Sequence, residues 1–510
     1  MIISLSVLVI TIIVSGTYAL YKAQLSKNIG VNTTTHGLAY YINYVKGTDI
    51  TAATLNPSTS YEGGASSDIE FWKKDDSYDI YGKIELTVNT IGTNLSNSPA
   101  LKYAVVNNGN VLKEGSLKGT TSGSKVTILK NLYLEQTKQI YTVYVWLDNS
   151  EELGNISNES LSISVDCTAS LQKEPTAADT IISLYTSAAK VTATNNSITY
   201  NTAPSVSLMN DRLGGTTTDL DGGNIRYYGA NPNNYIYFNC SDYSNQTSST
   251  CETWRIIGVF DGKLKLIKGS QIGTYSWDNK NISTGAENDT GKNDWTTARL
   301  MKLLNPSNYY KVDSNDNNLG QSLYYNSASG KCYSGQNNAT VDCDFTSTGI
   351  KNAETRNMIA ETTYNLGGWN SNSVYSNQIY EYERGTTVYS GRPTTWKGKI
   401  ALAYPSDYGY AADLNQCKDK TLYDYDNRTC TSNNWMKAII TNNGSNTGWL
   451  LTPRSGSSSN AWYVNSGGFV SRDSIAYVAY GAVPVLSLSS ELGIESGGDG
   501  SSSKPYKLSA

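Results

Sequence analysis

Residues 254–269 have the sequence WRIIGVFDGKLKLIKG, and this stretch decides how the second half of the chain folds. Two apolar runs, WRIIGVF and KLKLIKG, flank the dipeptide Asp261-Gly262. Asp-Gly between two such runs is typical of a two-residue hairpin turn, because both turn positions need positive φ angles. We therefore expect an antiparallel hairpin here.

Helical patterns follow the hairpin. Asp294 is expected to cap a helix over residues 293–305 (NDWTTARLMKLLN). The apolar stripe of this helix consists of Trp295, Leu300, Met301 and Leu304. A second helix is expected over about 352–366, where Gly367-Gly368 would stop it. Strands mixed with helices predict an α+β domain over residues 224–495, followed by a Gly/Ser-rich tail over 496–510.

Residues 28–168 have a different pattern, in which short runs alternate apolar and polar residues. The runs are YDIYGKIELTVNTI, LKYAVVN, KVTILKNLYL, IYTVYVWLD and LSISVDC, separated by turns such as NNGN, TTSGS and DNSEELGN. Short strands at this spacing predict an antiparallel β-sandwich. Residues 169–223 are expected to form a linker with a short helix near 177–191, where Ile181, Leu184 and Tyr185 have helical spacing.

The N-terminal residues 1–27 form a separate segment. Residues 2–21 (IISLSVLVITIIVSGTYALY) carry no charge and can just span a hydrocarbon core of about 30 Å. The same stretch also fits the apolar core of a signal peptide, since small residues follow near a cleavage point. The expected basic residues before it are missing, which we interpret as an upstream start. The segment is thus either a transmembrane helix or a signal segment.

Six of the seven cysteines fall into three close pairs, each of which brackets a polar loop. This spacing predicts three local disulfides in an oxidising compartment, each stabilising by roughly 3 kcal/mol. The pairs are Cys240 with Cys251, Cys332 with Cys343, and Cys417 with Cys430. The absence of any CxxC motif argues against a zinc site. Cys167 is left over, as a free thiol or with a partner outside this chain.

Charge and histidine usage exclude several function classes. The net charge is -4 and no basic cluster stands out, so we expect no nucleic-acid partner. The single histidine, His36, lies in a Thr-rich stretch. Ser-His-Asp and Cys-His catalysis need a buried, oriented imidazole, so we expect no enzymatic activity. The 39 Tyr and 10 Trp suit either a recognition surface or a β-rich extracellular scaffold.

The first third of the chain resembles the camelysin/TasA-like exported proteins of Gram-positive bacteria. The resemblance is carried by the hydrophobic segment that ends in GTYALYKA and by the stretch YTVYVWLDNSEELGN with LSISV after it. It implies an exported jelly-roll domain that can build extracellular fibres.

The second half resembles bacterial surface domains with a C-type-lectin-like fold, whose architecture is related to that of formylglycine-generating enzymes. The resemblance is carried by Trp254-Arg255-Ile256-Ile257, Asp294-Trp295, Tyr404-Pro405-Ser406-Asp407-Tyr408-Gly409, Trp449-Leu450-Leu451 with Pro453, and Gly481 to Leu486. The usual ending of the family is closer to YGVRPVL, and Gly481-Ala482-Val483-Pro484 lacks that arginine. The related enzymes use cysteines of the active cleft, whereas all paired cysteines here are assigned to local loops.

The resemblance implies that the ligand face lies in residues 462–480, with Asn465-Ser466-Gly467-Gly468 as a hairpin turn between Val464 and Val470. Aromatic anchors, one arginine and adaptable Ser and Asn groups are the mixture that recognition surfaces favour. The ligand-binding residues that we predict are Trp462, Tyr463, Asn465, Phe469, Ser471, Arg472, Asp473, Ser474, Tyr477 and Tyr480.

No cofactor is expected, although a structural calcium ion remains an alternative. Asp313, Asn315 and Asn317 recur at alternate positions, but Tyr324 stands where an EF-hand requires a bidentate Glu. Asp219 and Asp221 in TDLDGG are interpreted in the same way, as a solvated loop.

The sequence as a whole predicts a mainly β chain: an N-terminal hydrophobic helix, a jelly-roll-like sandwich and a C-type-lectin-like α+β domain. We expect a secreted or cell-surface binding protein, an adhesin or receptor for an extracellular protein or glycan, held at the membrane if the N-terminal segment is not cleaved. The alternatives are a structural subunit of an extracellular fibre or matrix that assembles with itself, and a carbohydrate-active or modifying enzyme.

Overall fold

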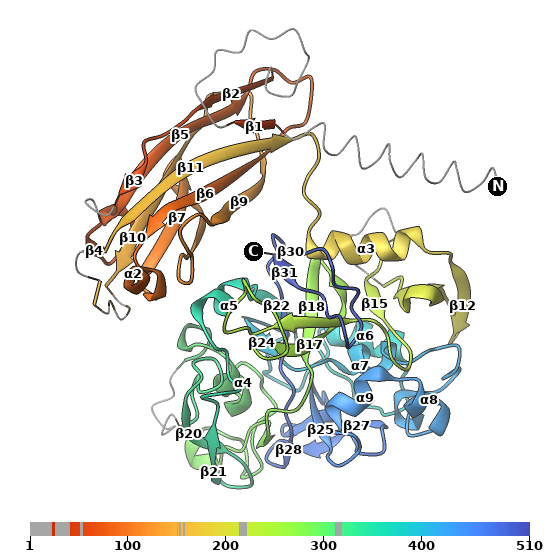
Figure 1. The fold of residues 1–510 in the computed structure, drawn as a ribbon. Helices are drawn as coiled ribbons and strands as arrows, with labels where there is room; N and C mark the ends of the chain where they lie inside the picture. Colours follow the sequence, from red (N-terminus) through yellow and green to blue (C-terminus); the bar gives the residue numbers. More distant parts are fainter. Residues whose placement is uncertain are drawn as a thin grey trace, which may run out of the picture. The chain divides into compact units, whose positions relative to one another are not determined.

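The computed structural model describes residues 23–25, 41–51, 55–149, 151, 153, 155–156, 159–213, 222–311 and 319–509. It divides into two compact units, Met1–Glu174 and Pro175–Ala510 (Figure 1). Both units are built mainly from antiparallel β-strands. This confirms the predicted mainly β class.

The first unit holds two sheets. One has the order β1 (Ala23–Leu25), β11 (Leu161–Ser170), β6 (Tyr81–Ile91) and β9 (Lys125–Tyr133), with β3 (Ile50–Thr51) also on β11. The other has the order β2 (Ile42–Val45), β5 (Ala65–Lys73), β10 (Ile140–Asp148), β7 (Leu101–Asn107) and β8 (Asn110–Ser116), with β4 (Pro57–Ser58) also on β10. A short helix α2 (Thr93–Asn97) and a 3-10 turn η3 (Tyr61–Gly63) complete the described part of this unit.

The alternating pattern of the strands explains why these two sheets share one core. Successive side chains of a strand point to opposite faces, so every second residue can be buried. Ile84, Leu86 and Val88 of β6 are fully buried, and so are Ile69 and Phe71 of β5 in the other sheet. The predicted antiparallel sandwich is therefore present.

The second unit is organised around two larger sheets. The nine-stranded sheet has the order β12 (Val191–Asn195), β13 (Ile198–Ala203), β14 (Leu208–Asn210), β15 (Ile225–Tyr227), β17 (Glu252–Phe260), β18 (Lys263–Lys268), β29 (Val485–Ser487) and β24 (Ile400–Ala401), with β16 (Tyr235–Phe238) also on β17. The five-stranded sheet has the order β19 (Thr274–Ser276), β28 (Ala479–Gly481), β25 (Gly448–Pro453), β26 (Asn460–Val464) and β27 (Val470–Ile475).

Short elements surround these sheets. The two-stranded ladders are β20 (Ser329–Tyr333) with β21 (Thr340–Asp344), β22 (Thr362–Asn365) with β23 (Thr395–Gly398), and β30 (Gly493–Ile494) with β31 (Leu508–Ser509). The helices are α3 (Ala177–Ser187), α4 (Arg299–Leu304), α5 (Ala353–Met358), α6 (Ser376–Arg384), α7 (Pro405–Tyr410), α8 (Arg428–Ser432) and α9 (Trp435–Ile440). The 3-10 turns are η4 (Pro204–Val206), η6 (Ile282–Thr284), η7 (Ser307–Tyr309) and η8 (Leu422–Asp424).

The predicted Asp261-Gly262 hairpin is confirmed. It joins β17 to β18, and Phe260 pairs with Lys263 across the turn. Asp261 and Gly262 have φ angles of 48° and 71°, as a two-residue turn of this kind requires. Other strands flank both β17 and β18, so the hairpin lies inside the nine-stranded sheet, with Trp254 fully buried.

The segment that we expected to be a linker forms part of the second unit. The helix α3 ends at Ser187, where the ammonium group of Lys190 donates hydrogen bonds to the carbonyls of Ala188 and Thr186, at 2.6 and 3.2 Å. The chain then enters β12, and β12 to β14 extend the nine-stranded sheet. The expected Gly/Ser tail is also folded, since β31 pairs with β30 and Tyr506 is buried.

Both helices that we predicted for the centre of the second unit are shorter than expected. The carboxylate of Asp294 accepts a hydrogen bond from the Thr296 amide at 3.1 Å, which closes a local turn, and α4 begins only at Arg299. The predicted stripe residues are nevertheless buried. The second helix ends at Met358 because Thr362–Asn365 pairs with β23 instead.

Several predicted features lie outside the described residues: the hydrophobic segment 2–21, His36, and the calcium candidates Asp219, Asp221, Asp313, Asn315 and Asn317. Among the helices that are described, none is long and apolar enough to span a bilayer.

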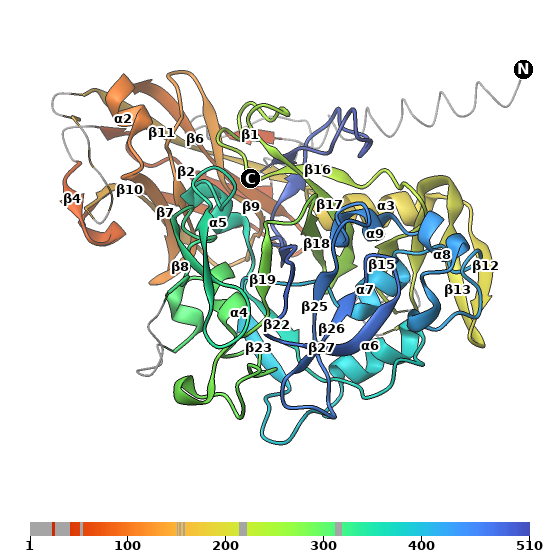
Figure 2. The same cartoon turned by 90° about the horizontal axis from the view of Figure 1, so that it is seen from below.

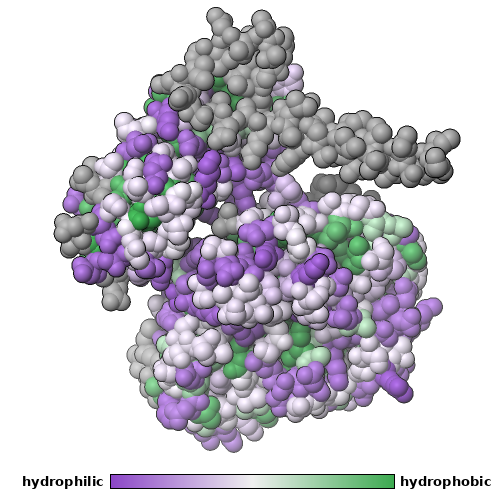
Figure 3. Space-filling model, viewed as in Figure 1, coloured by the Kyte–Doolittle hydropathy of each residue, from purple (hydrophilic) through white to green (hydrophobic). Residues whose placement is uncertain are grey.

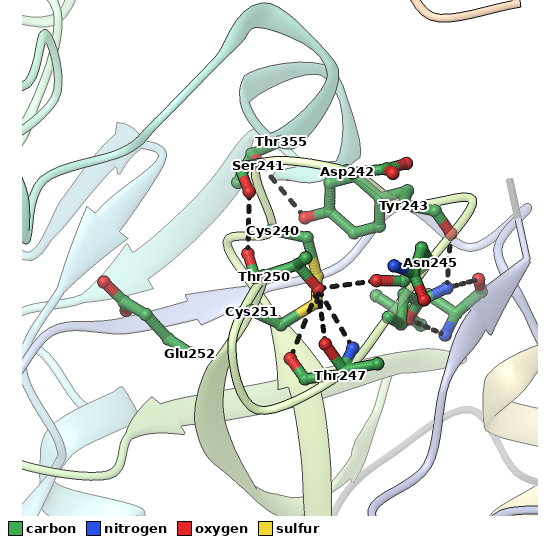
Figure 4. Close-up of a disulfide and its surroundings, with 12 residues drawn as sticks. Cys240, Ser241, Asp242, Tyr243, Asn245, Thr247, Thr250, Cys251, Glu252 and Thr355 are labelled. Atoms are coloured by element: carbon green, nitrogen blue, oxygen red, sulfur yellow. Dashed lines mark hydrogen bonds between the residues drawn. A yellow bond between two sulfur atoms is a disulfide. The ribbon is translucent and has the colours of Figure 1, made fainter.

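The three predicted disulfides are all present. Figure 4 shows Cys240–Cys251, which closes a loop whose Tyr243 hydroxyl lies 3.0 Å from the hydroxyl of Thr355 on α5. Cys167 has no disulfide partner and is fully buried in the core of the first unit. Such local disulfides are typical of proteins from oxidising, extracellular compartments.

Thiol labelling tests this cysteine assignment. Burial raises the pKa of the Cys167 thiol well above its ordinary value, so the folded chain should not react with a thiol reagent. After denaturation without reductant we expect one label per chain, and after reduction seven, counted by intact mass. Three or more labels before reduction would contradict the pairing.

Candidate ligand-binding face

The predicted ligand face lies on the five-stranded sheet, where β25, β26 and β27 run side by side (Figure 2). The predicted turn joins β26 to β27. Val464 pairs with Val470, the Asn465 amide donates to the Phe469 carbonyl at 2.9 Å, and the Gly468 amide donates to the Asn465 carbonyl at 2.8 Å. These bonds hold the hairpin in a defined shape without a ligand.

Three of the ten predicted residues do not face outward. Trp462, Ser471 and Ser474 are 0%, 3% and 6% exposed. Trp462 lies in the core beside Leu450 and Val470, because strand alternation turns it inward and its neighbour Tyr463 outward. Our expectation that Trp462 anchors a ligand is therefore corrected. Tyr463, Asn465, Phe469, Arg472, Tyr477 and Tyr480 are partly exposed, and Asp473 is exposed.

Aromatic rings on this face form a continuous series. The ring centroids are 5.3 Å apart for Tyr423 and Phe469, 6.5 Å for Phe469 and Tyr463, and 5.6 Å for Tyr463 and Tyr480. We call these four residues the tyrosine row. Tyr423 comes from η8 and is 48% exposed.

A buried side chain packs against one end of the row. Trp449, which is 1% exposed, packs 4.8 Å from Tyr480, and its indole N–H donates to the Tyr275 carbonyl at 2.9 Å. Burial, partly offset by a hydrogen bond with Ser471, raises the pKa of the Tyr463 hydroxyl. The Tyr463 hydroxyl is therefore neutral at neutral pH.

Sequence reasoning missed Tyr423, because its position depends on a separate loop. That loop, between Cys417 and Cys430, has the sequence KDKTLYDYDNRT. The aromatic and acidic residues of this loop could have indicated a functional role. The sequence does not show, however, that the disulfide and η8 place Tyr423 against Phe469.

A polar cluster joins Arg472 and Asp473 of β27 to Arg454, which directly follows β25. The Asp473 carboxylate accepts from Arg454 Nη1 at 2.6 Å and also from Arg472 Nη1. Asn370 accepts from both arginines, through its side-chain oxygen for Arg454 at 2.7 Å and its carbonyl for Arg472 at 2.9 Å. We call Arg454, Asp473 and Arg472 the arginine–aspartate cluster. Exposed ion pairs add little stability, so the effect of this network is to orient its side chains.

Figure 3 shows the polarity of one face of the second unit, where hydrophobic residues form small separate patches among hydrophilic ones.

A second group of charged residues lies in the interior of the same unit, around Asp407 of α7. The Asp407 carboxylate accepts from Arg226 Nη1 at 3.1 Å, from the Tyr404 amide at 3.0 Å and from Lys265. Arg226 Nε also donates to Asp211 at 2.6 Å. Burial alone would raise the pKa of Asp407, but the cations Lys265 and Arg226 outweigh it and lower that pKa.

Aromatic rings enclose this interior cluster. The guanidinium carbon of Arg226 lies 4.6 Å from the ring centre of Phe260 and 4.7 Å from that of Tyr410. Asp407 and Arg226 are 2% and 1% exposed. Perturbed charges of this kind occur at active sites and also in structural ion networks, and here no solvent contact gives a substrate access.

No metal site emerges from the described part of the chain, since it brings no three His, Cys, Asp or Glu side chains together in a suitable group. Tyr324, the residue at the twelfth position of the calcium candidate, is buried in the core.

Comparisons with known proteins add little. No family model matches the chain, and no curated protein matches it. A solved structure described as "Crystal structure of HCR/D F1240A mutant" aligns with 51% of this chain and 76% of its own, at 12% identity and a TM-score of 0.15. A likeness this weak carries no argument about fold or function.

The carboxyl of Glu383, next to the interior cluster, makes the stability of this unit depend on pH. Glu383 is fully buried and accepts from the Ser406 amide at 2.9 Å and the Ser406 hydroxyl at 2.6 Å. Burial raises its pKa from 4.5 to about 7. Between these pH values the folded chain keeps a proton that the unfolded chain has lost, so the free energy of unfolding falls as pH rises, by roughly 3 kcal/mol.

Glu383→Gln removes this ionisation and should flatten the urea-unfolding free energy of the second unit between pH 4.5 and 8 relative to the parent. Glu354, whose pKa burial also raises to about 7, titrates equally in both proteins and cancels from the difference. Parallel pH profiles for parent and variant would contradict the assignment.

Proposed function

We propose that this chain is a secreted or cell-surface binding protein, an adhesin or receptor, whose second unit binds its ligand through the face formed by β25, β26, β27 and β28. The observation that carries the proposal is the tyrosine row beside the arginine–aspartate cluster. Partly exposed aromatic rings next to arginine are enriched at the centres of binding surfaces. The three local disulfides support an extracellular site of action.

We propose a jelly-roll fold for the first unit and a C-type-lectin-like fold for the second. The first proposal is supported by two antiparallel sheets around one core. The second is supported by where the resembling stretches fall: WRII in β17, WLL in β25, and Gly481 to Leu486 from the end of β28 into β29, which takes the chain from the five-stranded to the nine-stranded sheet.

The N-terminal segment is proposed to be a signal peptide or a membrane anchor, on the strength of its uncharged apolar sequence. Binding without catalysis is proposed because the perturbed charge cluster around Asp407 is closed to solvent.

A specific observation also favours the fibre alternative. Among the described strands, β8 is at the edge of its sheet, and its Val111 and Leu112 are 43% and 41% exposed. An open edge with exposed apolar residues can pair with a strand of another chain. Lys113 and Glu114 follow on the same strand and limit such pairing.

Binding tests the main proposal. The full chain is screened against immobilised extracellular proteins and polysaccharides, and Tyr463→Ala is compared with the parent on every target bound. Loss of a central aromatic anchor typically costs about 2 kcal/mol, so we expect roughly 30-fold weaker binding. The matched control is Tyr78→Ala, a 45% exposed tyrosine of the first unit, which should bind like the parent. Equal affinities of Tyr463→Ala and the parent would rule out this face.

Electron microscopy of the exported chain tests the fibre alternative. If β8 mediates assembly, Val111→Lys with Leu112→Lys should abolish fibres, because two charges would enter the paired edge. Ile140→Lys is the control, since Ile140 is 44% exposed on β10, which other strands flank on both sides. Fibres that persist in the double variant, or a parent that stays monomeric, would refute assembly through β8.

A further inference from the structure

We propose that the tyrosine row is a binding site for a polysaccharide chain that needs no metal ion. The inference rests on the proposed function of the second unit as a binding module and names the chemical class of its ligand. It is built from the ring series, its support from below and the polar groups beside it.

The ring series fits a repeating ligand. Neighbouring centroids in the row are 5.3 to 6.5 Å apart, comparable with the spacing of successive sugar rings in a polysaccharide, and neighbouring ring planes are inclined by 42° to 65°, so successive rings present differently oriented surfaces. Sugar rings have apolar C–H faces and a polar rim. Tyrosine has the same combination of an apolar ring and a polar tip, and three of the four rings in the row are tyrosines.

The row is held in place before a ligand arrives. Trp449 packs against Tyr480, the β26–β27 ladder holds Tyr463 opposite Ser471, and the bonds of the β26–β27 turn hold Phe469. Side chains that are already ordered lose little conformational entropy on binding. A flexible polymer has weak contacts per ring, so a preformed row suits it well.

The arginine–aspartate cluster supplies the matching hydrogen-bond groups. Asp473 offers an exposed carboxylate that accepts, while Arg454 and Arg472 offer guanidinium groups that donate. Sugar hydroxyls both donate and accept, and they need such a mixture. Two guanidinium groups and one carboxylate leave the cluster with one net positive charge, which is compatible with neutral and with acidic polysaccharides. Tyr463 pairs with Ser471 across the β26–β27 ladder, and Arg472 and Asp473 follow Ser471 directly on β27, so the cluster lies beside the row.

A protein partner is less well matched to this face. Tight protein contacts rely on a large anchor that becomes fully desolvated at the centre of the interface. The tryptophan of this stretch, Trp462, lies inside the core and cannot serve as that anchor. What remains outside are the partly exposed rings of the row, which a sugar chain can follow one ring at a time.

The test uses the full chain and affinity electrophoresis in gels that contain one of four polysaccharides: a glucan, a soluble chitin, a mannan or a polygalacturonate. We expect at least one of these polysaccharides to slow the migration of the protein through the gel, and EDTA should not change this retardation. Tyr423→Ala with Phe469→Ala should weaken it at least tenfold, Tyr423→Trp should retain it, and Tyr78→Ala should match the parent. Unchanged disulfide content and thermal unfolding show that the variants are folded.

The outcomes separate this inference from the proposed function. Retardation that survives Tyr423→Ala with Phe469→Ala, or that EDTA abolishes, overturns the inference. Binding to a protein through Tyr463 with no retardation by any of the four polysaccharides also overturns it but keeps the proposed function. If the chain binds neither proteins nor polysaccharides, both this inference and the proposed function are refuted.

Discussion

The second unit depends on one carboxylate, that of Asp407. It joins Arg226 of β15 and Lys265 of β18 to α7, and Arg226 extends the network to Asp211. Such a buried network adds little net stability compared with apolar packing, because each charge loses its hydration. Removing one partner, however, leaves an uncompensated buried charge and costs about 3 to 5 kcal/mol. The network therefore fixes how α7 lies on the nine-stranded sheet.

Hydrogen bonds connect α7 and the residues just before it to the strands of the candidate ligand face. The Tyr408 hydroxyl, one residue after Asp407, donates to the Gly468 carbonyl in the β26–β27 turn at 2.8 Å. The Leu451 amide of β25 donates to the Ala403 carbonyl just before α7 at 2.9 Å. Buried tryptophans complete the frame, since Trp277 donates to the Leu450 carbonyl and Trp449 to that of Tyr275. The exposed rings of the row are thus held by interior groups that touch no ligand.

Features with local causes could be predicted from the sequence, and features with distant causes could not. The Asp261-Gly262 hairpin, the turn after Val464 and the three disulfides depend on neighbouring residues, and all of them are present. The second helix was predicted too long because Thr362–Asn365 pairs with a strand some 30 residues away. Trp462 was wrongly predicted to face outward, since composition alone does not reveal which residues of a strand point into the core. Tyr423 was missed because only tertiary packing brings it to the row.

The central claim is that ligand recognition is concentrated on the tyrosine row and the strands that carry it. Hydrogen-exchange mass spectrometry of the full chain, with and without the target found in the binding screen, tests it most directly. The account predicts slower exchange in peptides covering η8 and β26 to β28, and little change in the interior cluster around Asp407, which is already closed to solvent. Protection confined to the first unit, or to regions of the second unit away from this sheet, would contradict it.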